Sequence, residues 1–310
     1  MHPRTVEPLD LLHTARTQCG LVDVDQCHAA GLSRKAVRGL VDRGRWRRVA
    51  HRVLEIRAAA PSSSDLPARR RRSAWLALLT YGPEAVAVGA CALALHGIAG
   101  LPTSIRSEAA LPDAQNRRDR PGSRVRQFDD GLSWVQIDGR RVATLDWALA
   151  QAVPELPVRH GLAVLDAALH STSLDLAGLT RSHELARGRR GVATRHLLWS
   201  LADGRSESPL ESFARWECIE GGVPPDTLQL PLSDRDGRTL ARGDLGWRRG
   251  PHRWLVVEMD GVDVHGAPTA VFADRRRQNL FTGSGAVDLL RFTGRDLGTI
   301  ASTVRSALAR

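Results

Sequence analysis

The chain has 310 residues, of which 42% are hydrophobic and 25% are charged. This length predicts two or three domains, and the composition is that of a globular protein, which excludes wholesale disorder and fibrous repeats. Because the sequence holds no run of about 18 apolar residues, we expect neither a membrane span nor a membrane partner. Lys and Arg number 44 against 34 Asp and Glu, and the net charge of +10 favours a polyanionic partner.

The cysteines and the first residues bear on the cellular compartment. The four cysteines are scattered and include no C-x-x-C pair, so we expect neither a zinc knuckle nor a disulfide scaffold. The first residues lead into a mixed polar and acidic stretch without an apolar signal core. We therefore expect a reduced, cytoplasmic protein.

Changes in composition divide the chain into three predicted domains of a multi-domain α/β protein. Residues 1–57 form a compact basic unit, and the small, polar, proline-containing residues 58–67 follow as a linker. Residues 68–200 hold helical patterns and short strands, which predicts an α+β middle region. A second polar joint at 201–208 precedes residues 209–310, whose pattern predicts the element order αβββαβα.

The basic unit predicts a winged helix-turn-helix. A short amphipathic helix begins near Leu11, and a second helix over residues 22–30 has Asp23 as its expected N-cap. After a turn at 31–32, Ser33 caps a third helix over 34–43, whose apolar side chains fall on one face. Gly44 ends that helix, and the loose alternation of residues 45–56 predicts a β-hairpin wing.

Positive charge is concentrated on the third helix and the wing. Residues 34–57 carry nine cationic and two acidic side chains, a net charge of +7 in 24 residues. The start of a recognition helix can reach base edges in a major groove, and a wing lies near phosphates and the minor groove. The candidate DNA-binding residues are Arg34, Lys35, Arg38, Arg45, Arg47 and Arg48. The alternative interpretation is a solvated basic face on a small helical bundle.

A short motif in this unit resembles a known family. Its residues are Gly31-Leu32-Ser33, Val37, Leu40, Gly44, Arg48-Val49 and His51. The segment is similar to the N-terminal domain of AbiE-type antitoxins of type IV toxin–antitoxin systems. In this sequence Arg52 stands where the family usually has a glycine. The resemblance implies DNA binding and a cognate toxin as a further partner.

The middle region predicts a scaffold or interaction domain, because we find no catalytic constellation in it. An amphipathic helix follows the four arginines at 69–72, and residues 86–98 predict a buried helix of small residues. Strands at 135–137 and 141–142 flank an Asp138-Gly139 turn, and another helix starts at 143. This arrangement also resembles the central region of the antitoxin family.

The candidate catalytic and metal-binding residues lie in the last hundred residues. A helix opens at Pro209, and strands follow at 228–232, 240–247 and 254–259, with a turn at 234–237. Asp274 and the arginines after it lie in a predicted helix, residues 287–292 form a last strand, and a final helix runs over 295–308.

Acidic residues are predicted to meet on one face of this sheet. Alternate side chains of a strand share a face, so Glu258 and Asp260 project together, and a hairpin can bring Asp244 beside Glu258. Such carboxylates repel one another, and their burial is costly without a cation. Mg²⁺ or Mn²⁺ prefers oxygen ligands of this kind and can activate a water and neutralise a phosphate. We expect Arg277 and Arg291 to hold phosphate oxygens.

These elements resemble a domain of unknown function that is related to very-short-patch-repair endonucleases, within the PD-(D/E)XK, restriction-endonuclease-like superfamily. The matching residues are Leu210-Glu211, Asp244, Glu258-x-Asp260-Gly261, His265, Asp274-x-x-Arg277 and Leu290-Arg291-Phe292-Thr293. The resemblance implies Asp244, Glu258 and Asp260 as metal ligands, and Glu211 at the rim of the site. Asp260 stands where the superfamily has a lysine, so His265 is the candidate base. Asp263 and Asp274 are alternative ligands.

Two principal functions follow from these expectations. The first is a Mg²⁺-dependent DNA endonuclease that a winged helix directs to its target. The second is a DNA-binding antitoxin or repressor with an inactive nuclease-like domain. RNA is an alternative substrate. A second copy of the chain is a further candidate partner, since one winged helix covers a short footprint.

Overall fold

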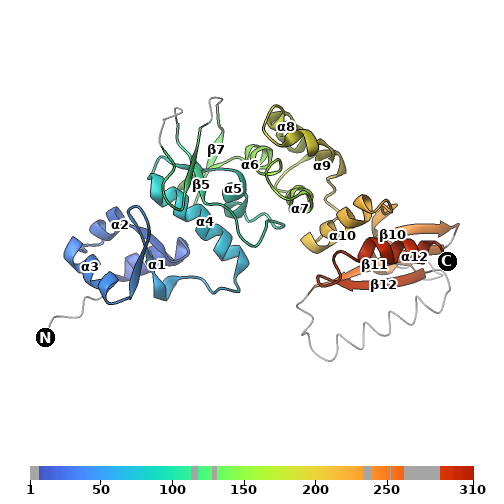
Figure 1. Ribbon diagram of the computed structural model, residues 1–310, viewed down its shortest axis with the longest axis horizontal. Coiled ribbons are helices and arrows are strands. Elements are labelled where there is room, and N and C mark those ends of the chain that lie inside the picture. Colours follow the sequence, from blue (N-terminus) through green and yellow to red (C-terminus); the bar gives the residue numbers. More distant parts are fainter. Residues whose placement is uncertain (1–6, 113–117, 128–130, 234–238, 252, 262–286) are drawn as a thin grey trace. The chain divides into compact units, whose positions relative to one another are not determined.

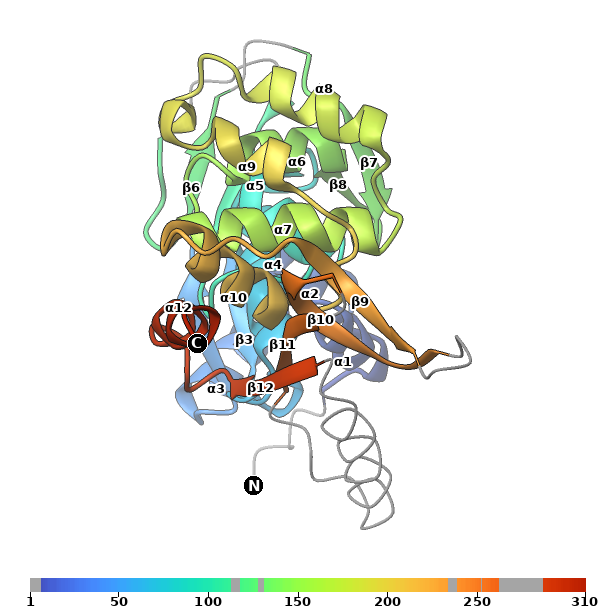
Figure 2. The same cartoon turned by 90° about the vertical axis from the view of Figure 1, so that its right-hand side faces the viewer.

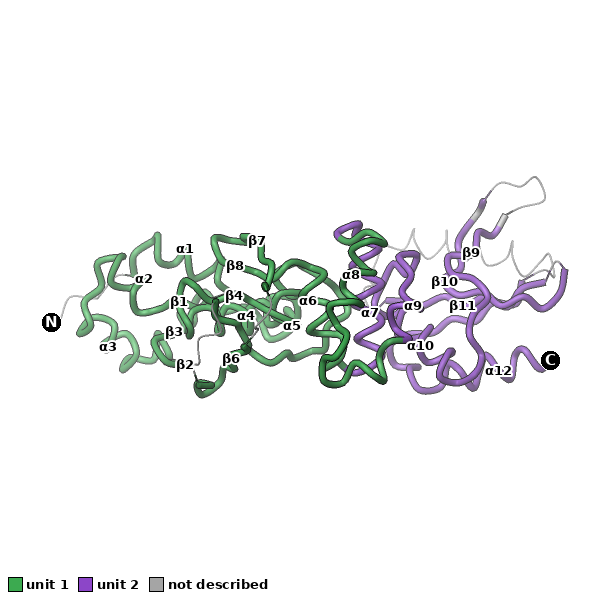
Figure 3. The backbone as a smooth tube through the Cα atoms, turned by 90° about the horizontal axis from the view of Figure 1, so that it is seen from above, with its two compact units in different colours: residues 1–156, 174–196 green, residues 157–173, 197–310 purple. Residues whose placement is uncertain are grey.

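The computed structural model describes residues 7–112, 118–127, 131–233, 239–251, 253–261 and 287–310. The chain divides into two compact units, which Figure 3 shows in different colours. The N-terminal unit comprises residues 1–156 and 174–196, and the C-terminal unit comprises residues 157–173 and 197–310. Helices and strands occur in both, as expected for a multi-domain α/β protein. Residues 157–173, which the sequence placed in the middle region, belong to the C-terminal unit.

The first part of the N-terminal unit is a set of three helices with a small antiparallel sheet. Its elements are α1 (Leu9–Thr17), β1 (Leu21–Asp23), α2 (Val24–Ala29), α3 (Arg34–Asp42), β2 (Trp46–Ala50) and β3 (Val53–Ile56) (Figure 1). The strand order is β1-β3-β2, so β3 pairs on both sides. The predicted hairpin at 45–56 is therefore confirmed, and β1 adds a strand that the sequence did not indicate.

Both predicted helix caps in this part are confirmed. The Asp23 carboxylate accepts the Gln26 amide at 2.8 Å, and the Gln26 side chain accepts the Asp23 amide at 2.9 Å. This reciprocal capping box fixes the start of α2 at Val24, later than predicted, because residues 21–23 pair as a strand. The Ser33 hydroxyl accepts the Ala36 amide at 3.2 Å and starts α3.

A compact apolar core orients α3. Val37 and Leu40 of α3 are buried against Trp46, Leu54 and other side chains of the same cluster. With one face of α3 in the core, its opposite face is left to solvent. The wing turns at Arg52, whose φ of 61° lies in the left-handed region that favours glycine.

The second part of the N-terminal unit is built on a five-stranded sheet of order β6-β5-β4-β8-β7. Its strands are β4 (Val86–Ala87), β5 (Glu108–Ala110), β6 (Arg124–Arg126), β7 (Trp134–Ile137) and β8 (Arg140–Ala143). The helices of this part are α4 (Leu66–Tyr81), α5 (Gly89–Leu95), α6 (Leu145–Ala152) and α8 (Leu176–Ala186), with short 3₁₀ turns at Arg57–Ala59 and Val192–Thr194.

Two predictions for this part have different outcomes. The hairpin at Asp138-Gly139 is confirmed, and both residues have positive φ, as a two-residue turn between antiparallel strands requires. The prediction of a helix over 86–98 is wrong at its first residues. Val86 and Ala87 pair with β5 and β8 as a buried strand, and the helix begins only at Gly89, whose φ is 51°.

In its described residues, the C-terminal unit combines helices with a four-stranded sheet of order β12-β11-β10-β9 (Figure 2). Its strands are β9 (Thr227–Ser233), β10 (Thr239–Gly250), β11 (Arg253–Asp260) and β12 (Val287–Thr293). The helices that lie wholly within it are α7 (Val158–His170), α10 (Pro209–Glu220) and α12 (Ile300–Leu308), and α9 (His196–Leu201) begins at the boundary. The predicted strands are confirmed, while α12 starts five residues later than the predicted 295.

The sheet of the C-terminal unit has apolar side chains on both faces. Leu245, Leu255 and Val257 pack with α10 and α12, and Val256 packs with Leu230 and other side chains in a second cluster. Strands β9, β10 and β11 are antiparallel, whereas β11 and β12 are parallel, which requires a crossover connection. The predicted turn at 234–237 and the helix at 274–277 lie outside the described residues.

Two further observations concern membrane-spanning helices and the cysteines. Across the described ranges, no helix is both long and apolar enough to cross a membrane. Cys19, Cys27, Cys91 and Cys218 are all described, and each is a buried free thiol.

Candidate functional site

Asp244 lies where strands β10 and β11 stop pairing. The paired register between the two strands ends at Leu245 opposite Val257, and Asp244 and Glu258 are the next residue on each strand. Beyond that point the Met259 amide donates to the Asp244 Oδ2 atom at 2.7 Å, so a carboxylate takes the place of a backbone acceptor. The local fold thereby fixes one oxygen of Asp244 to the neighbouring strand.

Burial and neighbouring acids raise the pKa of Asp244 to about 6. Removal from water is the main cause, and the charges of Glu211 and Glu258 raise the pKa further. Hydrogen bonds from the Met259 amide and the Gln229 side chain act in the opposite direction. Three acids from three different elements therefore share one electrostatic environment, which a cation would relieve.

Glu211 reaches this environment from the first turn of α10. Its side chain is buried, and its Oε2 atom accepts the Glu207 amide at 2.9 Å and the Gln229 Nε2 at 3.0 Å. Gln229 Nε2 also lies 3.5 Å from the Asp244 Oδ1 atom. One side-chain amide thus bridges two carboxylates that would otherwise repel each other.

Gln229 is a site residue that sequence reasoning missed. Its φ is 52°, a left-handed conformation inside strand β9. At this point the strand changes the face of its apolar side chains, since Leu228 lies in the core with α10 and Leu230 lies in the second cluster. A glutamine between leucines gives no signal of that irregularity, so spacing alone could not have found it.

Asp260 and Arg291 form a bidentate ion pair. Arg291 Nη2 lies 2.7 Å from Asp260 Oδ1, and Arg291 Nε lies 3.0 Å from Asp260 Oδ2. The register places Arg291 beside Glu258 on the neighbouring parallel strand, and the Nε atom is 3.7 Å from Glu258 Oε2. Arg291, which the sequence suggested as a phosphate clamp, therefore neutralises the charge of Asp260.

The structure brings together only some of the predicted site residues. Glu211 and Glu258 both raise the pKa of Asp244, while Asp260 is held by Arg291. In the part of the chain that is described, no three His, Cys, Asp or Glu side chains form a group that could hold a metal ion. His265, Arg277, Asp263 and Asp274 lie outside the described residues. The oxygen donors at Asp244 and Glu258, crowded and partly buried, suit a hard divalent cation.

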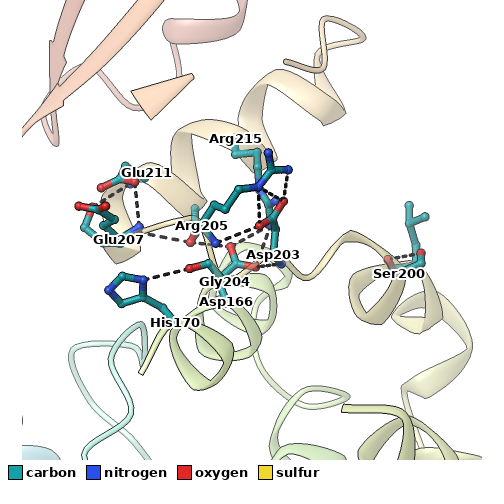
Figure 4. A network of polar contacts seen from close by, with 12 residues as sticks. Asp166, His170, Ser200, Asp203, Gly204, Arg205, Glu207, Glu211 and Arg215 are labelled. Carbon is teal, nitrogen blue, oxygen red and sulfur yellow. Dashed lines mark hydrogen bonds and ion pairs between the residues drawn. The ribbon is translucent and has the colours of Figure 1, made fainter. Parts of the chain in front are cut away.

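A buried network holds the start of α10 in place. The carboxylate of Asp166 on α7, which is 1% exposed, accepts two hydrogen bonds from Arg215 Nη2 at 2.8 and 2.9 Å. It also accepts the Ser212 hydroxyl at 2.7 Å and the Asp203 amide at 2.9 Å (Figure 4). The chain runs from Asp203, which is part of this network, to Glu207. The Glu207 amide donates a hydrogen bond to the Glu211 carboxylate. The network thus orients the backbone that positions Glu211.

The pKa of Asp166 is also raised to about 6, mainly by burial. Here the strongest opposing influence is the Arg215 charge, followed by the hydrogen bonds from the Asp203 amide and the Ser212 hydroxyl. Four donor contacts leave this carboxylate well satisfied in its ionised form. Asp166 therefore differs from Asp244, whose charged neighbours are other acids.

The predicted DNA-binding residues of α3 share one exposed face. Arg34, Lys35 and Arg38 are all exposed at the start of the helix, opposite the buried Val37 and Leu40. Their charges are thus available to a polyanion. On the wing, Arg45, Arg47 and Arg48 are also exposed.

Two of the wing arginines have acidic partners. Arg45 Nη2 lies 2.9 Å from Glu7 Oε2, and Arg47 Nη2 lies 2.8 Å from Glu55 Oε2. Glu55 is 7% exposed and also binds Arg72 of α4 at 2.6 Å. This pair of arginines on one buried carboxylate ties the wing to α4.

Comparisons with known proteins identify relatives but assign no activity. No family model matches the chain. Two proteins of Mycobacterium tuberculosis, from strains CDC 1551 / Oshkosh and ATCC 25618 / H37Rv, are each 32% identical to it over 147 residues. The match covers 47% of this chain and 53% of each relative, so the chain spans about half the length of the curated relatives it matches. Both relatives are described only as uncharacterized proteins.

Proposed function

We propose that the protein is a divalent-metal-dependent DNA endonuclease whose N-terminal winged helix binds DNA. The observation that carries the proposal is the partly buried carboxylate of Asp244 at the point where β10 and β11 stop pairing, whose pKa is raised to about 6 by burial and by the charges of Glu211 and Glu258. Crowded carboxylates in a partly buried position are costly unless a cation joins them. Mg²⁺ or Mn²⁺ is the cation that such oxygen donors would take.

The order and direction of the strands support a restriction-endonuclease-like fold for the C-terminal unit. One helix, α10, precedes three antiparallel strands, and β12 then adds parallel to β11. The acids stand on the elements that the superfamily uses: Glu211 on the helix, Asp244 on the second strand and Glu258 on the third. Fold-level similarity alone would not assign an activity, so the proposal rests on the acids.

In this proposal, Asp244 and Glu258 hold the metal ion and Glu211 lies beside them. The bound ion would supply activation of a water and neutralisation of charge on the scissile phosphate. The Met259 amide and Gln229 fix the orientation of Asp244, which keeps its carboxylate ready for the cation. His265 is the proposed base, and Arg277 a proposed phosphate clamp, on the basis of the sequence motif.

The Asp260–Arg291 pair changes the role proposed for both residues. Because Arg291 binds Asp260 through two nitrogen atoms, one at each carboxylate oxygen, its positive charge competes with a metal ion for this acid. Arg291 lies near Glu258 as well, so its positive charge replaces, in this environment, the charge of the superfamily's lysine. We therefore propose Asp260 as a positioning residue for Arg291.

DNA binding is assigned in this proposal to α3 and the wing. The arrangement of α1, α2, α3 and the β2–β3 hairpin supports a winged helix-turn-helix, with α3 as the recognition helix. The exposed face of Arg34, Lys35 and Arg38 would read or grip the major groove. Arg48 would contact phosphate from the wing.

The same N-terminal elements favour a second candidate function. A DNA-binding antitoxin or repressor would use α3 in the same way, with a toxin as its partner and without cleavage. Incubation of supercoiled plasmid with the full chain in Mg²⁺ or Mn²⁺, beside an EDTA control, separates the two. Metal-dependent nicking supports the endonuclease. Plasmid that is bound and shifted but uncut in both metals contradicts it and favours the repressor.

A further inference from the structure

The N-terminal unit contains a polar cavity of about 450 Å³, apart from the candidate DNA-binding surface. Small-molecule sites in proteins commonly enclose roughly 300–1,000 Å³, so a compact ligand fits this volume. The lining residues come from the loop before β6, from β6, from the end of α6 and from the segment after α8. They are Asp119, Arg124, Val125, Arg126, Gln127, Gln151, Pro154, Glu155, Arg189 and Arg190.

Gln151, one of the residues that line this cavity, carries a buried hydrogen-bond donor without an acceptor among the described residues. Gln151 is 2% exposed, and its Oε1 atom accepts the Gly89 amide at 2.8 Å. That bond fixes the orientation of the side-chain amide, because only the oxygen can accept from a backbone N–H. The Nε2 atom of Gln151 is left buried and has no hydrogen-bond partner among the described residues. Burial of an unsatisfied donor is costly, and a ligand oxygen would satisfy it.

The cavity is lined by four arginines and two acids, and the fold fixes two of the arginines. Arg126 binds both Glu108 and Glu155, which holds its guanidinium in place. Arg189 donates from Nε to the Leu185 carbonyl oxygen at 2.8 Å, and its guanidinium lies 5.3 Å from the centre of the Trp147 ring. A guanidinium held in place binds an anion with little further loss of side-chain entropy. Because Glu108 and Glu155 already offset the charge of Arg126, the charge offered to an anion comes from Arg124, Arg189 and Arg190.

A close backbone approach places Arg189 and Arg190 at the cavity. Gly191 has a φ of 89°, and a Cβ atom at that position would lie 2.7 Å from the Pro154 carbonyl oxygen. Only glycine permits the segment after α8 to pack so closely against the end of α6. Arg190 and Arg124 are exposed, so their guanidinium groups can turn toward a ligand in the cavity.

We propose that this cavity is a binding site for a phosphomonoester of about mononucleotide size. Guanidinium groups pair with phosphate oxygens through two parallel hydrogen bonds, and a phosphomonoester carries about −1.5 to −2 charges at neutral pH with three acceptor oxygens. The Gln151 Nε2 atom supplies a further, buried donor. A free nucleotide and the phosphorylated end of a DNA strand share this chemistry. The site is separate from the proposed nuclease acids, which belong to the other unit.

The test is calorimetric titration of the full chain in EDTA with deoxyadenosine 5′-monophosphate, deoxyadenosine and citrate. We expect saturable binding of the phosphorylated compound, and none of the nucleoside. A DNA trinucleotide with and without a 5′-phosphate forms a second pair of probes. Tighter binding of the nucleotide than of the nucleoside, or of the phosphorylated trinucleotide than of the unphosphorylated one, supports the site. The pair with the larger difference in affinity identifies the ligand as a free nucleotide or as a DNA end. Citrate binding as tight as that of the nucleotide, or no binding of any phosphorylated probe, would overturn the proposal.

Variants connect the binding to this cavity. Arg124→Ala with Arg190→Ala removes two exposed charges and should weaken nucleotide binding by about tenfold or more. Arg16→Ala with Arg310→Ala removes the same charge from exposed positions elsewhere and should leave the affinity unchanged. Gln151→Glu keeps an oxygen for the Gly89 amide but turns a second oxygen toward the ligand, so it should also weaken binding. Equal affinity in the Arg124/Arg190 variant and its control would contradict the site even if Gln151→Glu does not fold.

Discussion

The carboxylate of Asp244 accepts the backbone amide of Met259 at 2.7 Å, immediately after the last paired residues of β10 and β11. A side chain therefore completes the hydrogen bonding of a strand whose partner has begun to separate. This arrangement keeps an acid partly buried and close to Glu211 and Glu258, where its pKa rises to about 6. The ionised form of Asp244 is therefore less favourable in the folded protein than in water.

Replacement of this charge should stabilise the metal-free protein. The folded-state pKa of Asp244 lies above its ordinary value of 3.8, so this group's stabilising contribution is complete at low pH and is lost as the pH rises through about 6. Asp244→Asn keeps an oxygen for the Met259 amide and removes the charge. We expect it to raise the free energy of unfolding by roughly 1–2 kcal/mol at pH 8 in EDTA.

Urea denaturation at pH 8 and pH 4.5 measures this effect. At pH 4.5 the wild-type carboxyl is largely protonated in the folded state, so the difference between the two proteins should shrink. Glu220→Gln, an exposed acid on α10, serves as the control and should change little at either pH. A lower stability of Asp244→Asn at pH 8 would contradict the proposed crowding of acids.

Removal of the Asp166 charge should destabilise the protein, unlike removal of the Asp244 charge, although the pKa of Asp166 is raised to a similar value. Its partner is the buried guanidinium of Arg215, so Asp166→Asn leaves an uncompensated charge. We expect a loss of roughly 3–5 kcal/mol in the free energy of unfolding. The double variant Asp166→Leu with Arg215→Met should recover part of that loss in the same urea titration. A single variant as stable as wild type would mean that the pair contributes nothing.

Glu55 should be important for the attachment of the wing. It is buried and binds Arg47 and Arg72, and burial lowers the pKa of Arg72 while Glu55 raises it. Glu55→Gln should therefore cost about 2 kcal/mol in thermal or urea unfolding, because it weakens two charged hydrogen bonds. Glu84→Gln is the matched control, since Glu84 pairs with Arg141 but its side chain is 62% exposed. Equal losses in the two variants would contradict the structural role of Glu55.

DNA binding should depend on the exposed face of α3. Arg34→Ala with Arg38→Ala should weaken binding of duplex DNA by about tenfold or more and lower the slope of log affinity against log salt by about 2. Arg187→Ala with Arg310→Ala removes the same charge from other exposed positions and should preserve the slope. Fluorescence anisotropy over a series of salt concentrations measures both quantities. An unchanged slope in the α3 variant would show that this helix does not contact phosphates.

Local signals made much of the fold predictable. The caps at Asp23 and Ser33, the hairpin at 45–56 and the strands of the C-terminal unit follow from short-range patterns, and these were found where the sequence indicated them. Residues 86–98 were misjudged because a short run of small apolar residues fits a buried strand as well as a helix. The start of the helix at Gly89 depends on its positive φ, which the residue type permits but does not require.

The site was less predictable than the fold, because its decisive contacts join distant residues. Asp166 and Arg215 lie 49 positions apart, and their pairing joins α7 to α10 within the C-terminal unit. Asp260 and Arg291 lie 31 positions apart, and only the parallel register of β11 and β12 brings them together. Gln229 reaches two acids through a backbone irregularity. Motif spacing identified the acids but gave no information on which charges neutralise them.

The most direct test compares DNA cleavage by the wild type, Asp244→Asn and Glu220→Gln in Mn²⁺, with DNA affinity measured on the same samples in EDTA. The account predicts that Asp244→Asn lowers the rate of plasmid nicking by about 100-fold or more while DNA affinity stays unchanged, because the acid holds the metal and α3 holds the DNA. Glu220→Gln should cleave like the wild type. Nicking by Asp244→Asn at the wild-type rate would contradict the assignment of these carboxylates as the cleavage site.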